Sequence, residues 1–245
     1  MTARAAASPA TIVLVHGAWH GAWAWGDVVP RLTARGLDVR AIDLPGRGRG
    51  PGGHRLADHV AFLRRELESI DGPVVICSHS YGGAVAGEAA HGIPGVAHLV
   101  FVAAFMLEPG ESCADANQPV PAPVPGPGIV ERDGYMEVAE ESATALFFHD
   151  CAPAEARDAV ARLTPEHTHT TRIPVGRAAW HDVSSTYVVC ADDRALSPAA
   201  QLAMAERAGT RITVRSGHSI ALTRPGLIAD GLARVAAQGG RGSWS

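Results

Sequence analysis

The sequence predicts a doubly wound, mostly parallel α/β sheet with a small, mainly helical insertion. Three observations carry this prediction. Short apolar runs bounded by turn residues recur along the chain, helical patterns separate them, and the alternation breaks once, over about 107–184. With 245 residues the chain has a normal length for one α/β domain with an insertion, so one core is expected, formed by 1–106 and 185–245.

The expected strands are nearly continuous apolar runs, which are typical of strands buried on both faces of a parallel sheet. These runs are TIVLV at 11–15, DVRAID at 38–43, VVIC at 74–77, VAHLVFVAA at 96–104, STYVVC at 185–190 and TRITVR at 210–215. The helical patterns that accompany them cover 21–35, 56–70, 81–91, 199–208 and 225–238. Because strand and helix alternate, we expect parallel strands with helices over both faces.

The segment 107–184 interrupts this alternation and is expected to cover the sheet as a lid. It contains the Pro/Gly-rich run PVPAPVPGPG at 119–128, which suggests a mobile stretch. Two helical patterns follow at 135–148 and 153–163, and the segment has little strand character. A disordered linker over 112–130 is the alternative for its first part.

The composition excludes several classes of protein. The net charge is -4 without a basic patch for nucleic acid, and no apolar run approaches the roughly 20 residues of a membrane helix. We expect a cytoplasmic protein, because the chain enters a strand pattern without the layout of a signal peptide. The four cysteines are widely scattered and are expected to be free thiols. All 21 basic residues are arginine, which removes lysine-based chemistry.

The stretch VVICSHSYGG at 74–83 has the layout of a serine nucleophile on an α/β sheet. Such a serine needs a tight turn from strand to helix, which holds its Oγ above the sheet and leaves the next backbone N–H free for an oxyanion. The turn crowds the residues two before and two after the serine, so both must be small. Around Ser80 they are Ser78 and Gly82, so the motif is S-x-S-x-G instead of the usual G-x-S-x-G. The alternative is a polar turn residue.

The other members of a nucleophilic triad are sought in the chain order serine, acid, histidine. Of the twelve histidines, only His218 lies beyond residue 181, and it follows the last strand pattern at the carboxyl edge of the sheet. The loop after STYVVC supplies two adjacent carboxylates, Asp192 and Asp193, one of which should orient His218. Position alone does not separate the two. A solvated loop histidine is the alternative for His218.

An oxyanion hole needs a second backbone N–H, from the loop after the first strand. That loop reads HGAWHGAW at 16–23, and Gly17 lets its backbone approach a substrate closely. We therefore expect the N–H groups of Ala18 and Tyr81 to be the donors. The two histidines of this loop have no carboxylate or cysteine at ligand spacing, so structural roles are favoured over a metal site.

Five stretches of the chain resemble the α/β-hydrolase superfamily, in the order VLVHGAWHGAWAW, AIDLPGRG, SHSYGG, YVVCADDRALSP and SGHSIALTRP. They are most similar to its small-lid branch, which contains plant methylesterases, hydroxynitrile lyases and bacterial esterases. The resemblance spans about 11–235 and implies an α/β-hydrolase fold with no metal and no organic cofactor. In that branch the acid directly precedes the position held here by Arg194, which selects Asp193 over Asp192.

Within this branch, ester hydrolysis is favoured over cyanohydrin cleavage. The lyases carry a lysine after the catalytic histidine and a threonine in the oxyanion loop, where this chain has Ser219 and Gly17. Related epoxide hydrolases use aspartate in place of Ser80. We therefore expect a serine hydrolase that cleaves a small to moderate, largely apolar carboxylic ester through an acyl-enzyme. Lactone, thioester or cyclisation chemistry and a ligand-binding receptor are the open alternatives.

The substrate pocket is expected to be apolar. The residues expected to line it are Gly17, Trp19, Phe105, Phe148 and Trp180, with Trp23, Met106 and Phe147 as further candidates. A place in the core is the alternative for each of the large side chains. The expected partner is a small-molecule ester, nucleic acid and membranes are not expected partners, and a homodimer is left open.

Overall fold

The main sheet has six strands, all parallel to their neighbours, in the order β2-β1-β3-β4-β8-β9. The computed structural model describes residues 9–46, 48–49, 55–117, 125–240 and 244. The strands are β1 (Thr11–Val15), β2 (Val39–Ile42), β3 (Val74–His79), β4 (Val96–Val102), β8 (Ser185–Cys190) and β9 (Thr210–Val214). The parallel α/β sheet expected from the sequence is confirmed.

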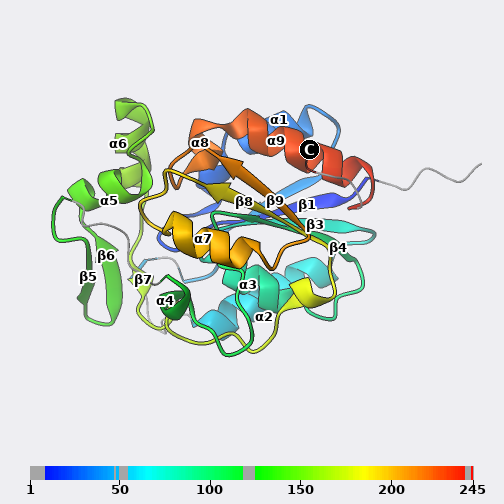
Figure 1. Ribbon diagram of the computed structural model, residues 1–245, viewed down its shortest axis with the longest axis horizontal. Helices are drawn as coiled ribbons and strands as arrows, with labels where there is room; N and C mark the ends of the chain where they lie inside the picture. Colours follow the sequence, from blue (N-terminus) through cyan, green and yellow to red (C-terminus); the bar gives the residue numbers. More distant parts are fainter. Residues whose placement is uncertain (1–8, 47, 50–54, 118–124, 241–243, 245) are drawn as a thin grey trace, which may run out of the picture.

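Helices cover both faces of this sheet (Figure 1). One face carries η1 (Ala22–Trp25), α1 (Val28–Thr33), α8 (Ile220–Thr223) and α9 (Pro225–Ala237). The other face carries α2 (Leu56–Glu68), α3 (Gly82–Ala89) and α7 (Pro198–Ala205). Successive strand residues point to opposite faces, so Leu14 packs with the first group of helices and Val13 and Val15 with the second. The helical pattern at 21–35 thus forms two short helices, η1 and α1.

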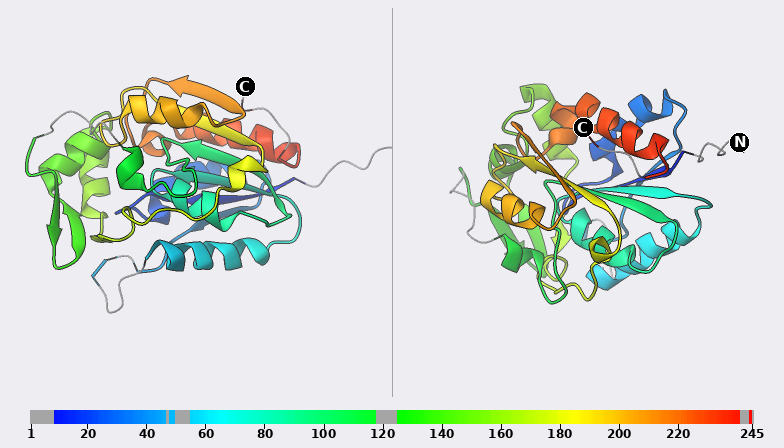
Figure 2. Two further views of the ribbon diagram at one scale, coloured as in Figure 1. Left: turned by 60° about the horizontal axis from the view of Figure 1, so that its bottom comes forward. Right: turned by 45° about the vertical axis from the view of Figure 1, so that its right-hand side comes forward.

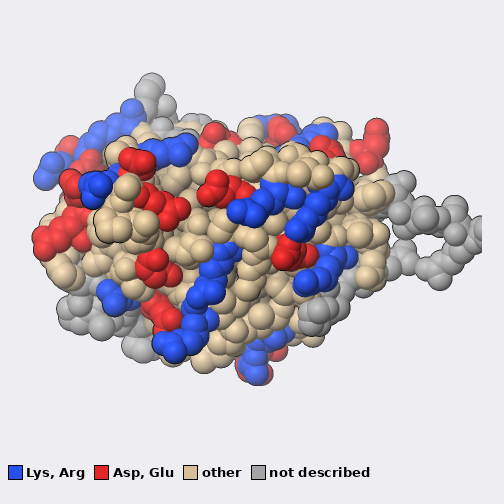
Figure 3. All heavy atoms as spheres, turned by 90° about the horizontal axis from the view of Figure 1, so that it is seen from above, with Lys and Arg blue, Asp and Glu red and all other residues tan. Residues whose placement is uncertain are grey.

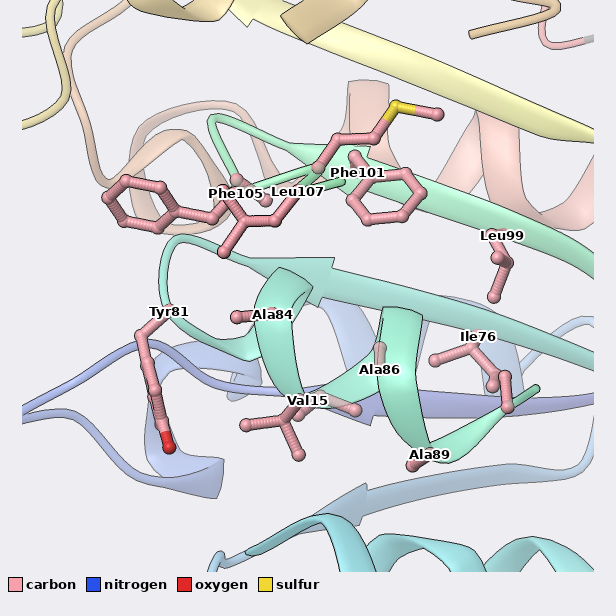
Figure 4. Packing of buried hydrophobic residues seen from close by; sticks show 14 of the residues in the cluster. Val15, Ile76, Tyr81, Ala84, Ala86, Ala89, Leu99, Phe101, Phe105 and Leu107 are labelled. Atoms are coloured by element: carbon pink, nitrogen blue, oxygen red, sulfur yellow. The ribbon is translucent and has the colours of Figure 1, made fainter. Parts of the chain in front are cut away.

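Helix α3 lies directly against the middle of the sheet. Its sequence GGAVAGEA consists mostly of small residues, and nearly all of them are buried. Figure 4 shows Ala84, Ala86 and Ala89 of this helix among larger side chains from the strands. A Cβ at Gly83 would lie 2.6 Å from the backbone oxygen of Phe105. The small side chains therefore permit the close approach that fixes the turn between β3 and α3.

The two edge strands are more exposed than the sequence predicts. The central strands β1, β3 and β8 are buried throughout, as expected. In β2 and β9, however, most residues are half-buried or exposed. An edge strand has a neighbour on one side only and is covered less completely by the helices. Continuous apolar runs therefore identified the strands but did not separate edge from centre.

The chain between β4 and β8 contains more strand than the sequence predicts. Its elements are α4 (Cys113–Ala116), β5 (Ile129–Arg132), β6 (Tyr135–Val138), α5 (Glu140–Phe147), α6 (Pro153–Ala161), β7 (Glu166–His167) and η2 (Ala179–His181). The three strands form a second, antiparallel sheet. Figures 1 and 2 show this sheet with α5 and α6 at one end of the main sheet. The expectation of little strand character is therefore wrong.

A tight hairpin explains the error at 135–148. Asp133 and Gly134 have φ angles of 53° and 80°, as in a type I′ turn, and the pairing of Arg132 with Tyr135 closes the hairpin. An Asp-Gly pair between two runs is a strong hairpin signal, so the residues after it continue as the strand β6. Only the later part of the predicted helix, which begins at Glu140, is helical.

The proline-rich run at 119–128 is described only in part. Residues 119–124, which belong to the stretch expected to be mobile, lie outside the described residues. Within the rest, the Ser142 hydroxyl donates to the backbone oxygen of Pro125 at 2.9 Å and accepts the N–H of Gly128 at 2.9 Å. The described parts of 112–130 also include α4 and β5. A disordered linker is therefore wrong for those parts.

Charges of both signs are interspersed on the face that contains α1 and α9 (Figure 3). Arg35 and Asp230, for example, form an ion pair between the end of α1 and α9. The described part of this face therefore has no continuous basic surface of the kind that binds nucleic acid. Within the described ranges, no helix combines the length and apolarity needed to cross a membrane.

Candidate active site

Ser80 lies in the turn between β3 and α3 with a strained backbone. Its φ angle is 51°, in the left-handed region that non-glycine residues seldom adopt. Two backbone N–H groups, those of Gly83 and Phe105, donate to its backbone oxygen at 3.0 and 3.1 Å. A serine on a strained strand-to-helix turn is the arrangement of a nucleophile elbow.

The residues two positions away from Ser80 are packed tightly. A Cβ at Gly82 would lie 2.6 Å from the backbone oxygen of His16, so only glycine fits there without movement. Ser78 is buried, and its hydroxyl donates to the backbone oxygen of Val100 on β4 at 3.2 Å. The unusual serine of the S-x-S-x-G motif therefore has a hydrogen-bond partner.

His218 and Asp193 form a buried hydrogen-bonded pair at the carboxyl edge of the sheet. The distance from His218 Nδ1 to Asp193 Oδ2 is 2.7 Å. Asp193 follows β8, and His218 follows β9. Asp192 is exposed instead and lies 3.7 Å from the Nε atom of Arg215. Of the two adjacent carboxylates, the structure thus places Asp193 against the histidine, and His218 lines the same cavity as Ser80.

A buried glutamine that sequence analysis did not identify holds Asp193. Gln201 Nε2 donates to Asp193 Oδ2 and to the backbone oxygen of Leu196, both at 2.8 Å. Its Oε1 accepts the N–H of Cys190 at 2.9 Å. These bonds use the whole amide group, and they hold the same carboxylate oxygen that lies against His218. The available signal was one polar residue in the apolar helix PAAQLAMA.

His79 is a second histidine whose role sequence analysis did not identify. Its Nε2 donates to the backbone oxygen of His218 at 3.0 Å, and the two ring centroids are 4.5 Å apart. Burial, together with the nearby charges that His218 and His20 can carry, holds the pKa of His79 well below its usual range. His79 therefore stays neutral and anchors the backbone of the loop that carries His218.

The loop after β1 brings Ala18 close to Ser80. A Cβ at Gly17 would lie 2.8 Å from the Ser80 Cβ, so the glycine permits this approach. The backbone N–H groups of Ala18 and Tyr81 donate to no group in the part of the chain that the structure describes. Both residues line the cavity that contains Ser80. Two unused backbone donors at one cavity are what an oxyanion hole requires.

Tyr81 is fixed by a side-chain relay. Its hydroxyl lies 2.9 Å from His59 Nδ1, and His59 Nε2 lies 3.0 Å from the backbone oxygen of Pro45. Because a carbonyl oxygen only accepts, Nε2 carries the proton and the Tyr81 hydroxyl donates to Nδ1. Burial raises the pKa of Tyr81 well above its usual range. The ring therefore serves to hold the turn after Ser80 in place.

The cavity beside Ser80 has a volume of about 270 Å³ and mostly apolar walls. The insertion contributes Cys113, Ala114, Asn117, Ile129, Met136, Leu146, Phe147 and Thr171. Its described walls carry no Asp, Glu or Arg side chain. The amide of Asn117 is occupied by the backbone oxygen of Ala195 at 3.1 Å and the N–H of Ser197 at 3.2 Å. Away from Ser80 and His218, a ligand would thus meet mainly hydrocarbon.

Two of the four aromatic residues expected in the pocket, Trp19 and Phe105, line this cavity. Trp180 does not. Its indole N–H donates to the backbone oxygen of Leu107 at 3.0 Å, and its ring packs against the core. Its place in the sequence before β8 puts it beside the base of the insertion, so the expectation of a substrate contact is corrected.

Phe148 does not line this cavity either, and its neighbour Phe147 does. Phe148 is buried with Ala143 and Ala156 between α5 and α6. Successive residues at a helix end point in different directions, so only one of two adjacent aromatic rings can face the cavity. The position beside the cavity that was expected for Phe148 is therefore held by Phe147.

Comparison with known proteins agrees with this architecture. A sequence model described as the alpha/beta hydrolase family matches residues 12–231. The alpha/beta hydrolase nvfD of Aspergillus novofumigatus is 25% identical over 232 residues, which cover 89% of this chain and 92% of that protein. Methylesterase 7 of Arabidopsis thaliana is 42% identical over 102 residues, 38% of this chain and 39% of that protein. The crystal structure of the pyrethroid hydrolase PytH, at 23% identity, has a TM-score of 0.79 and covers 95% of this chain and 99% of its own, a likeness of fold.

Proposed function

Because the chain belongs to the alpha/beta hydrolase family, we propose that it is a serine hydrolase that cleaves a small to moderate, largely apolar carboxylic ester. One observation carries the proposal: Ser80, on its strained turn, shares a cavity with His218 and with the unused N–H groups of Ala18 and Tyr81. The name of the relative methylesterase 7 supports an ester as the substrate.

In the proposed acylation, Ser80 Oγ attacks the ester carbonyl carbon while His218 Nε2 takes its proton. Asp193 accepts the Nδ1–H of the imidazole, which fixes the tautomer and stabilises the imidazolium that forms. The oxyanion of the tetrahedral intermediate accepts hydrogen bonds from Ala18 and Tyr81. The intermediate collapses when His218 returns the proton to the leaving alcohol.

Deacylation repeats these steps with water as the nucleophile. His218 Nε2 takes a proton from a water molecule, which attacks the acyl carbon bound to Ser80. The same two N–H groups hold the second oxyanion. Its collapse releases the carboxylic acid, and His218 returns the proton to Ser80 Oγ.

The segment 107–184 acts as the lid of this site in our proposal. It supplies half of the residues that line the cavity, and none of its described lining side chains is an acid or an arginine. A charged substituent would lose hydration there without gaining a partner, which costs several kcal/mol or more. The apolar lining and the volume of about 270 Å³ support an uncharged ester of small to moderate size.

Hydrolysis of p-nitrophenyl acetate and butyrate by wild type and Ser80→Ala tests the proposal. We expect the variant to lose at least about 10³-fold in kcat with an unchanged circular dichroism spectrum and melting temperature. Ser78→Ala is the matched control, since it removes a neighbouring hydroxyl that donates to Val100. Retention of activity within tenfold by Ser80→Ala would contradict the proposal. A wild type that binds esters without turnover would favour a ligand-binding receptor.

A further inference from the structure

Trp19, the residue after the proposed oxyanion donor Ala18, has a strained backbone. Its φ angle is 62°, and a bulky side chain makes the left-handed region costly. Surrounding contacts must therefore impose this conformation. Three hydrogen bonds of Trp19 are described, and each of them joins Trp19 to a residue of the lid segment 107–184.

The acceptors of the first two bonds belong to one cross-strand pair of residues in the small antiparallel sheet. Trp19 N–H donates to the Glu166 carboxylate at 3.3 Å, and its indole N–H donates to the backbone oxygen of Met136 at 3.0 Å. Met136 and Glu166 pair with each other across β6 and β7. The third bond runs from the N–H of Thr164 to the backbone oxygen of Trp19, at 2.9 Å. This cross-strand pair, together with Thr164, thus holds the backbone and the indole ring of Trp19 in place.

The contact to Glu166 acts on the peptide unit next to the proposed oxyanion donor. That unit joins the carbonyl of Ala18 to the N–H of Trp19. His20 Nδ1 lies 2.8 Å from this carbonyl oxygen, while the Glu166 carboxylate accepts the N–H. Held at both ends, the unit fixes the torsion angles that aim the N–H of Ala18 itself.

The loop that carries His218 is held in the same manner. Asp150, between α5 and α6, accepts the N–H of Gly217 at 2.6 Å and the hydroxyl of Ser216 at 3.3 Å. A Cβ on Gly217 would collide with this carboxylate. Hydrogen bonds from backbone N–H groups to carboxylates are among the stronger ones in proteins. Two acidic side chains of the lid segment therefore each hold one of the two loops.

We infer that Glu166 and Asp150 are positioning residues for the proposed hydrolysis, through which the lid segment sets the geometry of the oxyanion loop and the histidine loop. The inference rests on the proposed function. Neither carboxylate lines the cavity, so neither contacts the substrate. Their loss should therefore lower kcat, by misdirecting Ala18 and His218, and leave the KM for an apolar ester nearly unchanged.

Paired alanine and amide variants test this inference. We expect Glu166→Ala and Asp150→Ala each to lower kcat about tenfold with KM within about twofold. Glu166→Gln and Asp150→Asn keep an oxygen that can accept the N–H, so they should recover most of the activity. Glu131→Ala and Asp158→Ala remove exposed carboxylates of the same segment and serve as matched controls with wild-type kcat.

Amide hydrogen exchange, measured by NMR, gives a readout that does not depend on turnover. The Trp19 amide should exchange faster in Glu166→Ala, and the Gly217 amide in Asp150→Ala, whereas the controls should match wild type. An active wild type whose alanine variants keep both their kcat and their amide protection would overturn this inference alone. A wild type without esterase activity would overturn the proposed function, and the positioning role of both carboxylates with it.

Discussion

Ser80 and Trp19 are non-glycine residues in the left-handed region on two loops beside the cavity, and these two loops are held from different parts of the molecule. The backbone oxygen of Ser80 accepts the N–H groups of Gly83 in α3 and of Phe105 in the loop that follows β4. The backbone and ring of Trp19 are bound by the lid segment, Glu166 included. A left-handed backbone conformation is thus stabilised by the core in one loop and by the lid segment in the other.

This difference separates two kinds of damage. A change that disturbs the turn at Ser80 also disturbs the packing of β3 and α3, so stability and activity should fall together. A change in the lid segment acts on the loops or on the cavity wall and not on the packing of β3 and α3, so activity can fall while the sheet stays folded. Substitutions in each region can therefore show whether the two regions are damaged independently.

The largest effect is expected in the core, at the carboxylate that Gln201 holds. Asp193→Asn should lower kcat about 10⁴-fold, because an amide that faces His218 Nδ1 favours the wrong tautomer. Asp192→Asn should leave kcat near wild type, since Asp192 is exposed and lies beside Arg215. Steady-state kinetics of the two variants decide this point, and a greater loss at Asp192 would reverse the assignment.

Next in size is a pair of glycine substitutions in α3. Gly82→Ala places a Cβ 2.6 Å from the backbone oxygen of His16 and should lower the free energy of unfolding by about 1–3 kcal/mol, together with kcat. At Gly87, the added Cβ would have no atom within 4 Å apart from the backbone of its own helix. Gly87→Ala should therefore raise the free energy of unfolding by about 0.5–1 kcal/mol. Urea denaturation measures both. Equal free energies of unfolding for the two variants would mean that the turn at Ser80 is not held by the core.

A pH dependence of stability should also originate in the core. The pKa of buried His79 is lowered from 6.5, so below pH 6.5 the unfolded chain binds a proton that the folded chain does not. The free energy of unfolding should therefore fall with decreasing pH, by up to about 1.4 kcal/mol per pH unit for this group. His98, also with a lowered pKa, adds in the same direction. The free energy of unfolding, measured at pH 7.5 and about 5.5, should differ less between the two pH values for His79→Gln than for wild type. Equal differences in the two proteins would refute the role of His79.

The smallest effect is expected in the lid segment. Gly134→Ala and Gly36→Ala add a Cβ at φ angles of 80° and 75° with no atom within 4 Å, so each costs about 1 kcal/mol through the backbone alone. At Gly36, which follows α1, this cost should lower the melting temperature. At Gly134 it should speed amide exchange in β5 and β6 and change kcat by less than about threefold, with the melting temperature preserved. Equal losses of melting temperature would show that the two regions unfold as one.

The sheet could be predicted from the sequence because its elements leave local signals. Buried parallel strands are continuous apolar runs, and the turn at Ser80 needs small residues at fixed spacing. The order of strands then brings the loop with Asp193 and the loop with His218 to one edge. The hairpin at Asp133 and Gly134 left a local signal as well, and the helical pattern over the residues that follow obscured it.

Other parts of the site left no local signal. The contacts of Glu166 and Asp150 join residues far apart in the chain, and they depend on how the lid segment is oriented over the sheet. Which of Phe147 and Phe148 faces the cavity depends on where α5 ends, within one residue. Gln201 differs from both cases, because a polar residue in an apolar helix was visible in the sequence and only its partner was not.

The lid segment leaves the sheet after β4 and rejoins it at β8, and these two strands are neighbours. An exchange of this segment during evolution would therefore keep the strand order intact while it replaced half of the cavity wall. The incoming segment would also have to provide acceptors for the amides of Trp19 and Gly217. Substrate range and turnover would then be inherited as one trait, and recombined or grafted lids that lack these two carboxylates would bind new esters but hydrolyse them slowly.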